Sequence, residues 1–146
     1  MIGYVTLGTN DLPRAAAFYD TLLAEIGAKR LMEFPTGIAW GVSMQQCSLA
    51  LMKPYDGKPA TVGNGVMAAI VVDSKDKVDR VYKKAIELGA QDEGPNGPRG
   101  DGFYAGYFRD LDGEKPAAIY DMVLRSVEKP MLEVVLAKAG ANQTLA

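Results

Sequence analysis

The fold is decided by residues 2–28, which read IGYVTLGTNDLPRAAAFYDTLLAEIGA. At its start the apolar Val5 and Leu7 alternate with more polar neighbours, which is the two-residue period of a strand with two distinct faces. Asn10 or Asp11 then caps a helix whose apolar residues recur at helical spacing. The sequence therefore predicts a strand followed directly by a helix.

The same order returns later in the chain. After the first helix the sequence predicts three short strands, at 30–34, 38–44 and 48–53. A second strand-like segment follows a stretch rich in turn formers, and Ser74 then caps a second amphipathic helix that ends before Gly89. The remaining elements are expected to be a Gly- and Pro-rich loop at 94–102, a strand at 103–109, a turn at 110–113 and a last strand at 115–122. The chain is an approximate internal duplication.

This duplication sets the expected domain organisation. At 146 residues the chain has the length of one ordinary domain. One small sheet with a single helix has too little apolar area to be stable alone, so two copies are expected to share one core. We predict one domain at 1–126, built from modules 1–53 and 65–122 with a linker at 54–64, and a tail at 127–146 that includes a short helix.

Composition excludes several classes of function. Sixteen Lys and Arg against eighteen Asp and Glu leave a net charge of −2, with no basic cluster to meet phosphates, so no nucleic-acid partner is expected. The longest apolar stretches, such as 48–52 and 66–72, are far shorter than the roughly 20 residues of a membrane helix, so no membrane association is expected. The absence of a signal peptide predicts a cytoplasmic protein. The single cysteine, Cys47, is interpreted as a small buried hydrophobe.

Three stretches together resemble the vicinal-oxygen-chelate superfamily, which includes glyoxalases, bleomycin-resistance proteins and extradiol dioxygenases. They are Gly3-Tyr4-Val5-Thr6-Leu7 leading to Asp11-Leu12 and Ala17-Phe18-Tyr19, then Gly63-Asn64-Gly65, then Phe108-Arg109-Asp110-Leu111-Asp112-Gly113. The resemblance implies an α+β fold, with two tandem βαβββ modules forming a curved, cup-shaped mixed sheet and the helices outside. Asp110 and Asp112 are interpreted as turn residues that hydrogen-bond their own backbone.

The resemblance also implies a divalent metal held inside the cup, and here the residues differ from the family pattern. Where that pattern has two histidines and a glutamate, this chain has Tyr4, Met67 and Ala117. The strand at 48–52 supplies no carboxylate for a fourth position, and the chain contains no histidine. A transition-metal site of this kind needs imidazole and carboxylate donors. We therefore predict no metal and no cofactor.

Strand parity predicts which side chains line the cup. If Val5 and Leu7 face the first helix, their neighbours on that strand face the cup, and the same alternation applies to the other strands. The predicted ligand-binding residues are Tyr4, Thr6, Trp40, Met67, Ala69, Arg99, Phe103, Ala105, Tyr107, Ala117 and Ile119. Trp40 either stacks on a ligand or is buried structurally. Arg99 either pairs with an anion, as part of a lid formed by 94–100, or is solvated.

Tyr107 is the strongest single candidate for contact with a ligand, because relatives that modify antibiotics look similar in placing a tyrosine there. Tyr107 and Tyr4 are also the candidate catalytic residues. The predicted wall is apolar and aromatic, which favours binding or sequestering a small aromatic molecule, as bleomycin-binding relatives do as homodimers. One alternative is a metal-independent lyase or isomerase that uses tyrosine and arginine, although a tyrosine with a pKa of about 10 is a poor base without a nearby cation. A weaker alternative is a metal-dependent enzyme resembling lactoylglutathione lyase or a dioxygenase. Enzymatic activity is left open.

Overall fold

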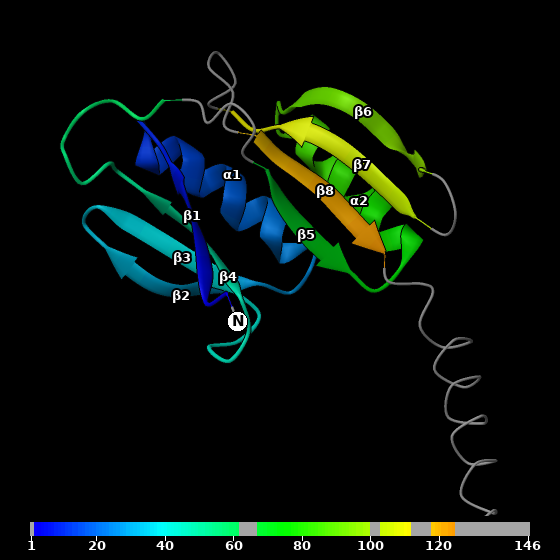
Figure 1. Cartoon of the computed structure of the whole chain (residues 1–146), viewed down its shortest axis with the longest axis horizontal. Helices are drawn as coiled ribbons and strands as arrows, with labels where there is room; N and C mark the ends of the chain where they lie inside the picture. The colour runs from blue at the N-terminus through cyan, green and yellow to red at the C-terminus, as the bar shows by residue number, and fades with distance from the viewer. Residues whose placement is uncertain (1, 62–66, 100–102, 112–117, 125–146) are drawn as a thin grey trace, which may run out of the picture.

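A computed structural model describes residues 2–61, 67–99, 103–111 and 118–124. One strand, one helix and three strands follow each other, and this order then repeats (Figure 1). The elements are β1 (Tyr4–Gly8), α1 (Leu12–Ala24), β2 (Lys29–Phe34), β3 (Gly37–Gly41), β4 (Ser48–Met52), β5 (Ala68–Val72), α2 (Lys75–Glu87), β6 (Gln91–Pro98), β7 (Tyr104–Arg109) and β8 (Ala118–Leu124). The predicted pair of βαβββ modules is confirmed. The predicted tail at 127–146 lies outside the described residues.

The first strand and helix form where the local sequence predicts them. On β1, Leu7 is 5% exposed in the core, whereas Tyr4 is 63% exposed on the opposite face. Asp11 begins α1 by accepting a hydrogen bond from the backbone N–H of Arg14 at 3.1 Å, so the structure selects Asp11 between the two predicted caps. After α1 the chain turns at Gly27, whose φ of 76° is one that glycine adopts without strain.

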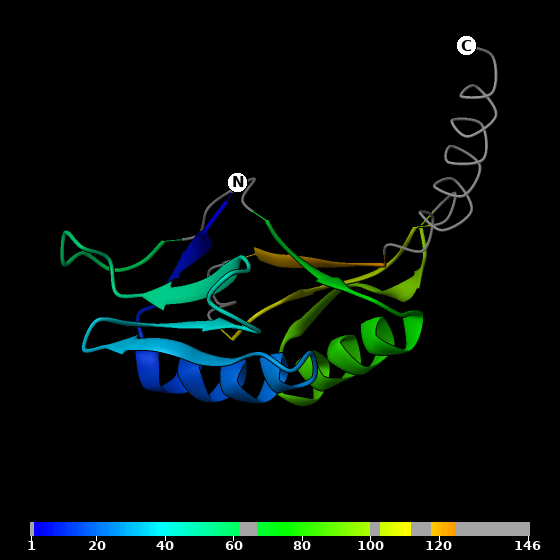
Figure 2. The same cartoon turned by 90° about the horizontal axis from the view of Figure 1, so that it is seen from below.

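The two modules have the same sheet topology. The strand orders are β1-β4-β3-β2 and β5-β8-β7-β6. In each sheet the first strand of the module pairs in parallel with the last, and the other pairs are antiparallel. Figure 2 shows α1 and α2 on the same side of the curved surface that the sheets form. The opposite face carries no helix among the described residues.

The segment after α2 differs from its prediction. The sequence predicts a loop over 94–102, and for 94–98 this is wrong because β6 pairs with β7 there. As the edge strand of its sheet, β6 tolerates proline, whose missing N–H need not join the ladder. Its register shifts between Asp92 and Gly94 and again between Gly94 and Gly97, as expected for a bulged edge. The Gly- and Pro-rich composition marks an irregular strand here.

Two of the sequence motifs meet in the core. The hydroxyl of Tyr19 in α1 donates a hydrogen bond to Oδ2 of Asp110, just after β7, at 2.7 Å. Both residues are buried, with 1% and 4% of their surfaces exposed. The interpretation of Asp110 as a turn residue missed this long-range bond, while Asp112 lies outside the described residues. Phe18 and Phe108 belong to the same core cluster, which joins the two modules.

The two helices are too short to span a membrane. Both α1 and α2 contain 13 residues. Within the described ranges, no helix is long and apolar enough to cross a bilayer.

Candidate functional site

The predicted cup residues of β1 and β5 lie on the exposed side of their strands. Tyr4 and Met67 are 63% and 52% exposed, and Thr6 and Ala69 are also exposed. Their neighbour Ala68 is buried in the alternating pattern that strand parity predicts. The structure therefore gives these side chains the predicted orientation, and their contact with a ligand stays a prediction.

The predicted wall of the second module is less open. Ala105 in β7 has no exposed surface, whereas Tyr107 is half-buried. Phe103 precedes β7 and is also half-buried. Ala117 lies outside the described residues, as does the side chain of Ile119 in β8. On β7 it is therefore Tyr107, not Ala105, that has surface available to a ligand.

Arg99 folds back onto the hairpin formed by β6 and β7. Its guanidinium carbon lies 5.5 Å from the ring centroid of Tyr107, and one guanidinium nitrogen donates to the carbonyl of Pro95. The backbone N–H of Arg99 donates to the carbonyl of Phe103 at 2.8 Å. The segment predicted as a lid loop, 94–100, is strand over 94–98, and its action as a lid stays a prediction. Two predicted site residues, Arg99 and Tyr107, are nonetheless brought together.

A pocket of about 530 Å³ opens between the two modules. Its walls come from β1, the C-terminal end of α1, the β3–β4 region and β5, and most of the lining is apolar. Representative lining residues are Val5, Leu23, Ile26, Trp40, Leu49 and Ile70. Three predicted ligand-binding residues, Trp40, Met67 and Ala69, line this pocket. Tyr4, Thr6, Arg99 and Tyr107 are not among its lining residues.

Sequence reasoning missed most of this pocket. Val5 and Ile70 line it, although strand parity predicts that both face the core. They reach the pocket because β1 and β5 are edge strands of separate sheets, and no local sequence signal marks that separation. Cys47 also lines the pocket, and its predicted burial is wrong because it lies exposed and free in the β3–β4 loop.

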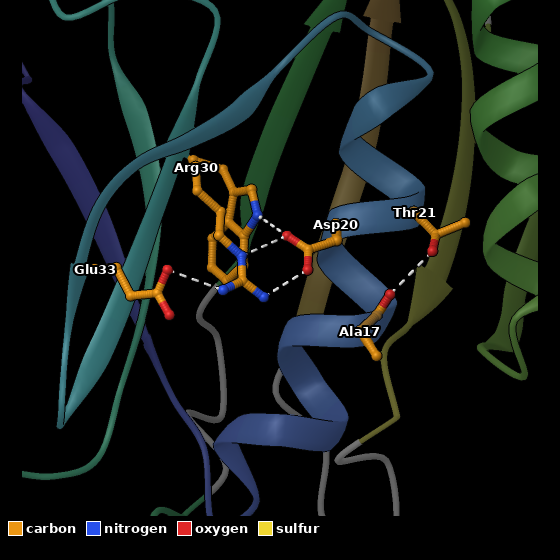
Figure 3. Close-up of polar contacts among 6 residues, drawn as sticks. Ala17, Asp20, Thr21, Arg30 and Glu33 are labelled. Atoms are coloured by element: carbon orange, nitrogen blue, oxygen red, sulfur yellow. Dashed lines mark hydrogen bonds and ion pairs between the residues drawn. The ribbon is translucent and has the colours of Figure 1, made fainter.

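Trp40 is held in the pocket wall by a polar network. The residue is 1% exposed, and its indole N–H donates to Oδ1 of Asp20 at 2.7 Å. Figure 3 shows Arg30 meeting the same carboxylate, with Nε 2.9 Å from Oδ1 and Nη2 2.6 Å from Oδ2. The hydrogen bond from Arg30 lowers the pKa of Asp20 below its ordinary value, so the carboxylate stays ionised at neutral pH. Trp40 is thus buried, as one of its two predicted alternatives requires, and it also lines the pocket, so stacking on a ligand stays a prediction.

Comparison with known families decides the identity of the fold. The profile of the Glyoxalase/Bleomycin resistance protein/Dioxygenase superfamily matches residues 1–115. The chain belongs to this superfamily.

Solved structures of the glyoxalase/bleomycin resistance superfamily agree with this assignment. A glyoxalase/bleomycin resistance protein from Albidiferax ferrireducens T118 is 29% identical, covers 86% of this chain and 98% of its own, and has a TM-score of 0.74. A lactoylglutathione lyase from Agrobacterium tumefaciens is 19% identical over 88% of this chain and 95% of its own, with a TM-score of 0.61. The fosfomycin resistance protein FosX from Listeria monocytogenes is 18% identical, with the same coverage and TM-score. The last two show the fold alone.

Curated Fis-like DNA-binding proteins match a short part of this chain. A Fis-like DNA-binding protein from Ralstonia nicotianae is 58% identical over 40 residues, which are 27% of this chain and 52% of that protein. One from Neisseria meningitidis serogroup A is 52% identical over 40 residues, or 27% of this chain and 51% of its own. The chain spans about half the length of these relatives. A similarity of this extent does not assign the chain to their family.

Proposed function

We propose that this member of the glyoxalase/bleomycin resistance superfamily binds a small, largely apolar and aromatic organic molecule, and that it does so without a transition metal held by its own side chains. The observation that carries the proposal is the apolar pocket between the modules. Its volume of about 530 Å³ lies within the roughly 300–1,000 Å³ typical of small-molecule sites.

The chemistry of the pocket supports an aromatic ligand. The wall combines aliphatic side chains with the indole of Trp40, and aromatic rings pack favourably against one another in edge or offset geometry. Its polar members, which include Gln46, Cys47 and Ser48, lie together in the sequence where β4 begins. A ligand with an apolar body and one polar end matches this distribution.

The side chains at the family's metal positions do not fit a transition metal. Tyr4 and Met67 offer a phenol and a thioether where the family pattern has imidazoles, and Ala117 offers no donor. The chain contains no histidine. Within the described ranges, no group of three or more Cys, Asp or Glu side chains could hold a metal ion. These facts support the metal-free part of the proposal.

A single-tryptophan fluorescence titration tests the proposal directly. Trp40 is the only tryptophan and lines the pocket, so an aromatic ligand should quench or shift its emission. Ligands would be found by a thermal-shift screen of aromatic metabolites and antibiotics, because binding to the folded state raises the melting temperature. Met67→Glu, which places a charge in the wall, should weaken binding, whereas the exposed Tyr55→Phe should not. No saturable binding by any aromatic compound would contradict the proposal.

Elemental analysis of protein purified without an affinity-tag histidine tests the metal-free part separately. After dialysis against manganese, nickel, iron and zinc, we expect far less than one metal ion per chain. A stoichiometric, tightly held metal would return the lyase and dioxygenase alternatives to first place.

A homodimer is part of the proposal, and exposed apolar side chains support it. Ile2, Val42, Met67 and Val71 line the pocket and are each more than half exposed, and Met44 nearby is 63% exposed. Clustered exposed apolar residues commonly mark interaction surfaces. Light scattering should report a dimer for the native protein and a monomer for Met44→Glu. A monomeric native protein at micromolar concentration would contradict this part.

A metal-independent enzyme remains the alternative for catalysis, because the structure places the Arg99 guanidinium over the Tyr107 ring. Once a ligand is known, turnover that is lost in Tyr107→Phe while binding persists would favour the enzyme. Binding without turnover in the native protein would favour the binding protein.

DNA binding is a second candidate function, and the 58% identity over 40 residues to a Fis-like DNA-binding protein favours it. The net charge of −2 and the lack of a basic cluster predict the opposite. Fluorescence anisotropy of a labelled DNA duplex at several salt concentrations decides between DNA binding and its absence, since binding to phosphates weakens steeply with added salt. Salt-dependent binding by the whole chain would establish a nucleic-acid partner.

A further inference from the structure

The indole of Trp40 combines packing in the core with a polar contact to α1. The ring packs against Tyr19, with centroids 5.9 Å apart and planes tilted by 41°. The indole N–H is a donor only, so in a buried position it requires an acceptor. Oδ1 of Asp20, at 2.7 Å, is that acceptor. Asp20 therefore satisfies the one donor of the buried indole.

Arg30 holds this acceptor in place. Two of its nitrogens meet the two oxygens of Asp20 at 2.9 and 2.6 Å, a forked arrangement that fixes the plane of the carboxylate. Glu33 binds the third nitrogen, Nη1, at 3.0 Å. In Figure 3 the chain of contacts runs from Glu33 and Arg30 on β2 across to Asp20 on α1. The carboxylate thus cannot turn away from the indole without breaking the pair with Arg30.

We propose that Asp20, oriented by Arg30, is a positioning residue for the ligand pocket: it keeps the indole of Trp40 in the wall and so sets the shape of the aromatic site. The inference rests on the proposed function for its ligand, but the geometry of Trp40 can be tested without one. Asp20 does not line the pocket itself. Its effect on a ligand passes through Trp40.

The test compares Asp20→Ala with two controls. Tyr55→Phe changes a fully exposed side chain outside the pocket lining, and Glu33→Gln removes an ion pair of Arg30 without touching Trp40. Two readouts are measured: acrylamide quenching of Trp40 emission, and the affinity for the dye anilinonaphthalene sulfonate excited by energy transfer from Trp40. In Asp20→Ala we expect red-shifted, more quenchable emission and a dye affinity lower by roughly threefold to tenfold, because the dye must then restore the indole to the position that this hydrogen bond holds in the native protein. Both controls should stay within about twofold of the native protein.

A double-mutant cycle separates positioning from a general loss of structure. Phenylalanine at position 40 has no N–H, so adding Asp20→Ala to Trp40→Phe should change dye affinity, read from the directly excited dye, by less than about twofold. An equal loss in both backgrounds would overturn the inference, because Asp20 would then act through the fold as a whole. Unchanged Trp40 emission in Asp20→Ala would overturn it as well. A native protein that binds neither the dye nor any screened aromatic compound would instead defeat the proposed function, while the quenching comparison would still test the position of Trp40.

Discussion

Replacing Tyr19 by phenylalanine is expected to destabilise the protein through the loss of its hydrogen bond to Asp110. The hydroxyl donates to the carboxylate of Asp110 at 2.7 Å, and both residues are almost fully buried. Phenylalanine keeps the ring contacts with Phe18 and Trp40, whose centroids lie 5.1 and 5.9 Å away, so packing changes little. Removing one partner of a buried hydrogen bond costs about 1–3 kcal/mol, so we expect a loss of about 2 kcal/mol in the free energy of unfolding.

Urea denaturation measures this loss. With a denaturant slope of about 2 kcal/mol per molar, the unfolding midpoint of Tyr19→Phe should fall by about 1 M. Tyr55→Phe is the matched control, because Tyr55 is fully exposed and the same hydroxyl deletion there should leave the midpoint unchanged. A shift below about 0.3 M in Tyr19→Phe would refute the reasoning that this bond ties the two modules together.

Three further predictions follow from local geometry. A Cβ added at Gly37 would press against the Met52 side chain and lie 2.6 Å from the backbone carbonyl oxygen of Leu51, which cannot move aside, so Gly37→Ala should lower the free energy of unfolding by about 1–3 kcal/mol in urea. The Arg30 guanidinium lowers the pKa of Asp20 from its ordinary 3.8. The stability that this pair contributes is therefore present above about pH 4 and is lost as the pH falls through the folded-state pKa of Asp20. The difference in melting temperature between the native protein and Arg30→Met should accordingly shrink at acid pH. Burial raises the pKa of Tyr82 to about 12. The stability that its neutral phenol contributes is therefore present below about pH 10 and is lost as the pH rises through 12. An ultraviolet titration of the native protein, compared with Tyr82→Phe, should show one tyrosine that ionises at this higher pH.

A specific result would contradict each of the predictions for Gly37, Arg30 and Tyr82. Gly3→Ala is the control for the crowded glycine, because a Cβ there meets nothing within 4 Å, and equal stability of the two variants would refute the clash. A constant difference between native protein and Arg30→Met from neutral to acid pH would show that the ion pair adds no pH-dependent stability. A phenol at position 82 that ionises together with the exposed tyrosines would show that its burial has been misjudged.

Local signals were sufficient to predict the helices and most strands. Asp11 and Ser74 begin helices because their side chains accept hydrogen bonds from N–H groups of the first turn. The alternation on β1 predicts its buried and exposed faces, which Leu7 and Tyr4 occupy. The strand β6 was missed because local rules treat Gly and Pro as loop formers, whereas pairing with β7 at a sheet edge tolerates them.

The site was only partly predictable, because its residues come together through the packing of two modules. Parity correctly gave the exposed faces of Met67 and Ala69, and both line the pocket. Strand parity predicted that Val5 faces the core, because parity distinguishes only the two faces of one sheet and does not predict a space between two sheets. The link between Trp40 and Asp20 joins β3 to α1 and has no signature at that spacing in the sequence.

By itself the sequence determined the duplicated order of elements, the resemblance to the glyoxalase superfamily and the absence of histidine from the family's metal positions. These properties depend on residue identity and on neighbours close in the chain. The tertiary structure alone decided that Tyr19 meets Asp110 across 91 positions, that Cys47 is exposed, and that the pocket lies between β1 and β5. Such contacts arise when separate elements bury their apolar faces against one another, and their geometry follows from packing rather than from any local pattern.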